Sequence, residues 1–66
     1  MDPNACWREL SKAVKNDDWQ RASSHADDLL EWLGKGGFAP HITGNQAFDR
    51  IVARATCVAV ASWEVA

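Results

Sequence analysis

The sequence predicts an all-α fold, a small three-helix domain, and two observations lead to that prediction. Apolar residues recur at steps of three and four along most of the chain, which is the spacing of one helix face. The pattern breaks twice, at KNDD (residues 15–18) and in GKGGFAPHITGN (residues 34–45). Because 66 residues hold one domain with a small core, we expect residues 1–66 to form a single helical unit.

The first helix is expected over about residues 3–15. Asp2 is a suitable N-cap, and Pro3 fits the first turn, where a missing N–H has no cost. The apolar positions that follow have helical spacing, so this helix should bury one stripe. That stripe contains Cys6, Trp7, Leu10, Ala13 and Val14.

The second helix is expected over about residues 18–33. Asp17 and Gln20 have the spacing of a capping box, and Gly34 is placed to end the helix in a left-handed conformation. Its predicted core stripe is Trp19, Ala22, Ala26, Leu29, Leu30 and Leu33. Since the connection to the first helix is short, the two helices should pack as an antiparallel hairpin.

The loop that follows should be held to the core by Phe38 and Ile42. A third helix is then expected over about residues 45–64, with either a capping box of Thr43 and Gln46 or a cap from Asn45. The residues expected to face the core are Phe48, Ile51, Val52, Ala55, Val58, Ala59 and Trp63. A strand over residues 56–65 is the alternative, because TCVAVASWEV is rich in β-branched residues.

The segment DWQRASSHADDLLEWL resembles the second helix of a tetratricopeptide repeat, with Trp19 followed by Ala22 and then Ala26. Trp7 and Leu10 are similar to the Trp and Leu of the first helix of such a repeat. The resemblance covers residues 7–33, although Ser11 stands where the family prefers glycine and no second repeat follows. It implies a helical-hairpin architecture.

The sequence favours a protein without catalytic function. His25 and Asp28 are one helical turn apart, but no nucleophile with a recognisable motif accompanies them, and an exposed polar pair explains them. No close Cys or His pair has zinc spacing, and the glycine-rich stretch lacks the features of a phosphate loop. We therefore expect no metal, no cofactor and no small-molecule substrate. The net charge of −2 and an acidic second helix disfavour nucleic acid.

Protein contacts are the expected mode of action. Ala53, Cys57 and Ala61 recur every four residues with Val60 beside them, which predicts a self-association surface and a homodimer. Trp32 lies off the predicted core stripe, in line with His25 and Asp28. It either packs on the third helix, forms a hot spot for a partner, or lies idle on the surface. The alternative function is a small acidic inhibitor or adaptor that masks a basic surface.

The two cysteines, Cys6 and Cys57, are too few for a disulfide framework, so we expect free thiols. The first residues lack the pattern of a signal peptide, and the longest uncharged run is too short to span a bilayer. A cytoplasmic location without membrane contact is the resulting expectation.

Overall fold

The computed structural model describes residues 1–63 and confirms the all-α fold. Its helices are α1 (Pro3–Lys15), α2 (Trp19–Gly34) and α3 (Gln46–Ala61). The third helix therefore ends earlier than expected, and its predicted end at residue 64 lies outside the described residues. Residues 56–61 are helical, so the alternative of a strand there is wrong.

The caps of α1 and α3 follow the sequence closely. The Asp2 carboxylate accepts hydrogen bonds from the backbone N–H of Asn4 and Ala5, at 3.0 and 3.3 Å. Asn45 caps α3 by accepting from the N–H of Phe48 at 3.0 Å, so the amide cap forms rather than the Thr43 alternative. These side chains satisfy N–H groups that have no partner within their own helix.

The ends of α2 differ from the expectation by one or two residues. Asp18, not Asp17, is the N-cap and accepts from the N–H of Arg21 at 3.2 Å. Asp17 instead adopts a left-handed conformation with φ of 55°, which turns the chain between α1 and α2. At the other end Gly34 is still helical, and the left-handed glycine is Gly36 with φ of 87°.

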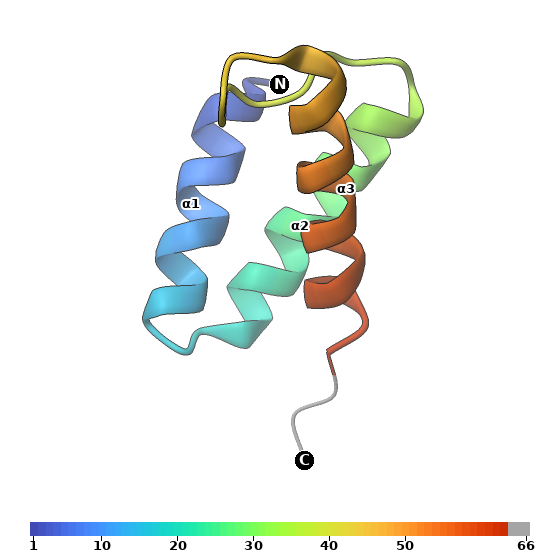
Figure 1. Cartoon of the computed structure of the whole chain (residues 1–66). Coiled ribbons are helices and arrows are strands. Elements are labelled where there is room, and N and C mark those ends of the chain that lie inside the picture. Colours follow the sequence, from blue (N-terminus) through green and yellow to red (C-terminus); the bar gives the residue numbers. More distant parts are fainter. Residues whose placement is uncertain (64–66) are drawn as a thin grey trace.

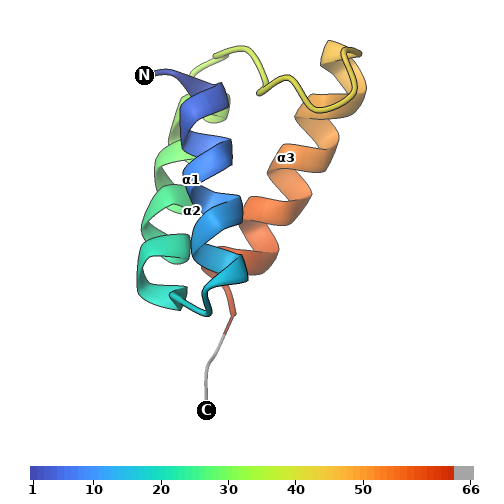
Figure 2. The same cartoon turned by 90° about the vertical axis from the view of Figure 1, so that its left-hand side faces the viewer.

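α2 is the central helix of the bundle. It runs antiparallel to α1, which confirms the predicted hairpin, and α3 packs on another side of it (Figure 1). In the view of Figure 2, no other described element lies on the side of α3 that faces away from α1 and α2. A large part of the α3 surface is therefore left without an intramolecular partner.

The core is built largely from small side chains. Its buried apolar members are Cys6, Leu10, Ala13, Ala22, Ala26, Leu29, Leu33, Ala39, Ala53 and Cys57. The expected stripes of the first two helices are confirmed, with Trp7, Val14, Trp19 and Leu30 half-buried at their edges. Small residues on facing helices allow their backbones to approach closely.

The expected core face of the third helix is wrong. Phe48 is 53% exposed, Ile51 67% and Val58 51%, whereas Ala53 and Cys57 are completely buried. Because each residue of an α-helix advances by about 100°, these two sets lie on opposite sides of α3. Compared with the prediction, α3 is rotated about its axis, so that its small residues contact α2 and its large ones face solvent.

Trp63 also departs from its predicted position in the core. It lies beyond the end of α3, is 59% exposed, and stacks on Trp19 at the start of α2. The two rings are nearly parallel, with a centroid separation of 5.1 Å and an interplanar angle of 6°. This pair covers the end of the bundle where α1 turns into α2.

Candidate interaction surface

The rotation of α3 is set at its first turn by Asp49, the one buried charged residue among those described. Its carboxylate accepts hydrogen bonds from the N–H groups of Ile42, Thr43 and Gly44, at 2.9–3.1 Å. The Thr43 hydroxyl donates a fourth hydrogen bond at 2.6 Å. The loop before α3 is thus closed around this carboxylate, which turns Asp49 toward the protein and the opposite side of the helix toward solvent.

The hydrogen bonds to Asp49 also change its acidity. Burial raises the pKa of this carboxyl, but the hydrogen bonds from Thr43, Ile42 and Gly44 favour the ionised form more strongly. The net effect lowers the pKa from 3.8 to about 2. Asp49 is therefore a structural anion at neutral pH, with its hydrogen-bonding capacity used by the loop.

Two further side chains join α3 to the loop and to the end of α2. Gln46 accepts a hydrogen bond from the N–H of Ala39 and donates one to its carbonyl oxygen. Arg50 donates to the carbonyl oxygens of Leu33 and Gly37, at 2.5 and 2.7 Å. Since the last turn of α2 has no basic residue of its own, Arg50 supplies the cation that this negative helix end favours.

The outer side of α3 is apolar over the length of the helix. We call it the α3 stripe and define it by Phe48, Ile51, Val52, Ala55, Val58 and Ala59. All are exposed except Val52, which is half-buried. Their spacing of three and four places them on one face, and none is charged or polar. Isolated exposed apolar residues are ordinary, but a contiguous row of large ones typically marks a surface that another molecule covers.

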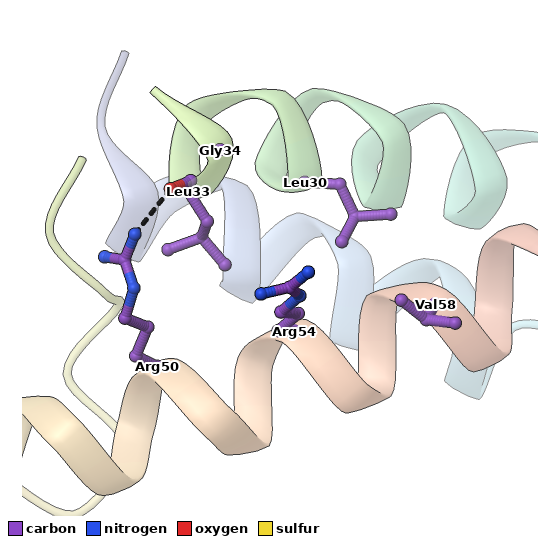
Figure 3. A pocket seen from close by; sticks show the side chains of 6 residues that line it. All are labelled: Leu30, Leu33, Gly34, Arg50, Arg54 and Val58. Atoms are coloured by element: carbon purple, nitrogen blue, oxygen red, sulfur yellow. Dashed lines mark hydrogen bonds between the residues drawn. The ribbon is translucent and has the colours of Figure 1, made fainter. Parts of the chain in front are cut away.

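A shallow groove of about 500 Å³ adjoins the stripe between α2 and α3. Leu30, Leu33, Gly34, Arg50, Arg54 and Val58 line it (Figure 3). Val58 belongs to both groove and stripe, whereas the side chains of Arg50 and Arg54 extend from α3 toward α2. The two cations of α3 are therefore directed away from the stripe, which remains uncharged.

The residues predicted to form a self-association surface lie inside the molecule. Ala53 and Cys57 are completely buried, and Val60 and Ala61 are half-buried against the core. A second chain cannot reach Ala53 and Cys57, so the expectation of a surface built on this row is wrong. The sequence signal was a row of small residues that permits close helix approach, but the helix that approaches is α2 of the same chain.

Trp32 matches none of its three interpretations completely. It is half-buried and packs against the core, but its specific contacts are with the loop rather than with α3. Its indole N–H donates to the carbonyl oxygen of Phe38 at 2.9 Å, and the two rings meet edge to face at 5.9 Å. The ring lies over Gly37, where a Cβ atom would collide with it. Trp32 thus holds the first part of the loop.

His25 and Asp28 do not form a joint site. Half-buried His25 lines a small hollow with Glu9 and Arg21, and exposed Asp28 lines another with Met1 and Lys35. No hydrogen bond between the two side chains is present in the described part of the chain. Within residues 1–63, no group of three or more His, Cys, Asp or Glu residues is arranged to hold a metal ion.

Both cysteines are free, buried thiols. The Cys6 thiol donates to the carbonyl oxygen of His25 at 3.4 Å. Burial raises the pKa of Cys57 to about 11, with a smaller contribution from Cys6, and burial likewise raises the pKa of Cys6. Thiols in this state are poor nucleophiles and act as small apolar core residues.

Comparison of the chain with protein-family models, with curated proteins and with solved structures gives no match. None of the three described helices is long and apolar enough to cross a membrane. The interpretation of the surface therefore depends on its own geometry, in which the α3 stripe is the outstanding feature.

Proposed function

We propose that this chain is a non-enzymatic protein-interaction module that binds through the α3 stripe. The observation that carries the proposal is the exposure of Phe48, Ile51 and Val58 on one uncharged face. A domain this small gains stability when a partner covers apolar surface, because burial contributes about 25 cal/mol per Å². The same residues on an idle surface would favour aggregation.

The buried hydrogen-bond network gives the proposal a structural reason. An α3 helix rotated by half a turn would bury its large residues, but Asp49 would then lose the loop donors that it now holds. The fold instead uses its polar contacts to keep the large residues outside. Such an arrangement is expected where the outer face is used for binding.

The alternative of an acidic inhibitor receives less support. Two acidic residues of this face already have basic neighbours, since Asp18, the N-cap of α2, pairs with Arg21 at 3.5 Å and Glu31 pairs with Lys35 at 3.0 Å. Both pairs are exposed and contribute little to stability, but they reduce the net negative field of this face.

The proposal is tested by photo-crosslinking in cells that naturally make the protein. A benzoylphenylalanine at Phe48 places the reactive group on the stripe, and the same residue at Phe38 is a matched control, because Phe38 is 56% exposed in the loop. We expect a discrete crosslinked species from Phe48 and none from Phe38. Equal crosslinking at the two positions, or no crosslink at Phe48, contradicts the proposal.

A further inference from the structure

We infer that the molecule covering the α3 stripe is a second copy of this chain, whose α3 packs antiparallel with a two-fold axis at Ala55. The inference rests on the proposed function and identifies its partner. It places the homodimer contact on the side of α3 opposite to Ala53 and Cys57.

The order of large and small side chains along the stripe is complementary to the same order in an antiparallel second copy. In an antiparallel pair centred on Ala55, Phe48 lies opposite Ser62 of the other copy, and Ile51 lies opposite Ala59. The two largest side chains of the stripe, Phe48 and Ile51, therefore each meet a small residue, while Val52 lies opposite Val58 and the two copies of Ala55 meet at the axis. Alternation of large and small residues across facing positions is what allows helices to interdigitate.

A parallel pair does not have this fit. It would set Phe48 against Phe48 and Ile51 against Ile51, which holds the helices apart at one end. The row of alanines at Ala55 and Ala59 would then face each other across a void, which forfeits contact energy. A two-fold antiparallel arrangement is also an isologous, closed contact, the commonest symmetry among soluble dimers.

The distribution of charge around the stripe is compatible with a second copy of the chain as the partner. The stripe carries no charge, so the pairing buries none, and both arginines of α3 extend toward α2 (Figure 3). Among residues 1–63, none of the exposed acidic side chains lies on α3; they are Asp2, Glu9, Asp17, Asp27, Asp28 and Glu31. Uncharged apolar cores with charged residues at the margin are typical of homodimer interfaces.

The size of the contact sets its strength. From Phe48 to Ala59 the stripe is about 17 Å long at about 1.5 Å per residue, and a helix is about 10 Å wide. A contact between two such faces is smaller than the roughly 1,000 Å² that a stable specific interface buries, so it belongs with the weak, transient contacts. The dimer should accordingly be reversible, with a Kd on the order of micromolar.

The first test is the mass of the purified full chain by sedimentation equilibrium from about 1 to about 500 μM, a range that brackets such an affinity. We expect the wild type to pass from monomer to dimer and Ala55→Glu to remain monomeric. Ser24→Glu is the control, because it adds the same charge at an exposed position of α2. A monomeric wild type at all concentrations, or an Ala55→Glu variant that dimerises like it, overturns the inference.

The second test reports the register and does not depend on a disruptive variant. Chains carrying Ile51→Cys and Ala59→Cys, distinguished by a mass tag, are mixed and oxidised mildly. The native thiols are buried, so the introduced ones should react. The antiparallel pair predicts a mixed 51–59 disulfide, whereas predominant disulfides between identical chains would overturn it.

Different results would refute the proposed function and the identification of a second copy as the partner. A purified chain that stays monomeric, while Phe48 crosslinks to a protein of another mass, refutes the second copy and leaves the proposed function intact. Absence of both the dimer and any Phe48 crosslink refutes both.

Discussion

The rotation of α3 can be tested by comparing two substitutions on opposite sides of the helix. Ala53→Leu enlarges a completely buried side chain in the core cluster that also contains Ala22 and Ala26 of α2. Such a site has no room for the added atoms, so α2 and α3 must separate. Overpacking of this kind destabilises a protein by about 1–3 kcal/mol.

Ile51→Ala is the matched change on the outer side. Ile51 is 67% exposed, so truncation removes contacts from the remaining third of the side chain. Since complete burial of an isoleucine contributes about 1.5–3 kcal/mol, the expected loss in the monomer is about 0.5–1 kcal/mol. With the opposite rotation Ile51 would be a core residue, and its truncation would cost about 2–5 kcal/mol.

The assay is urea unfolding followed by circular dichroism, at a concentration low enough to keep the protein monomeric. The free energy of unfolding should fall more for Ala53→Leu than for Ile51→Ala, with unchanged m-values. In thermal melts each kcal/mol corresponds to about 4–8 °C for a domain of this size. An Ile51→Ala variant less stable than Ala53→Leu would refute the rotation and the exposed stripe with it.

Three further predictions concern the loop and the thiols. The ionised Asp49 stabilises the fold above about pH 4, and this contribution should disappear as the pH falls toward 2, because its pKa is about 2 in the folded chain and 3.8 otherwise. An Asp49→Asn variant should lack that part of the acid transition in pH-dependent urea melts, and an unchanged transition would contradict the network. Gly37→Ala should displace the Trp32 ring and red-shift its fluorescence, whereas an unaltered spectrum and melting temperature would show that no clash exists. Cys57 should resist iodoacetamide at pH 8 in the native state and react after denaturation; rapid native labelling would contradict its burial.

The existence and approximate bounds of the helices follow from local chemistry. Asp2 followed by Pro3 specifies the start of α1, and Asn45 specifies the start of α3, because short polar side chains there satisfy N–H groups of the first turn. The hairpin of α1 and α2 also follows locally, since its short connection leaves an antiparallel arrangement and each helix has one apolar stripe. These features depend on residues close together in the sequence.

The interaction surface does not follow from local chemistry, because α3 has two apolar sides. Periodicity identifies Phe48 and Ile51 as one side and Ala53 and Cys57 as another, and hydrophobicity favours burying the larger residues. The tertiary structure decides otherwise. Asp49 binds loop residues five to seven positions earlier in the chain, and this network turns α3 about its axis.

The sequence by itself therefore determined the helices, the N-cap of α1 and the hairpin. The tertiary structure decided the ends of α2, the cap of α3 and the side of α3 that meets solvent. The physical reason lies in the range of the interactions involved. Caps and helix periodicity involve one helix at a time, whereas helix orientation depends on the combined fit of side chains from the loop, α2 and α3. Here three features outweighed the burial of the larger apolar residues. They are the hydrogen bonds of Arg50 to the end of α2, those of the loop to Asp49, and the burial of small Ala53 in the core cluster.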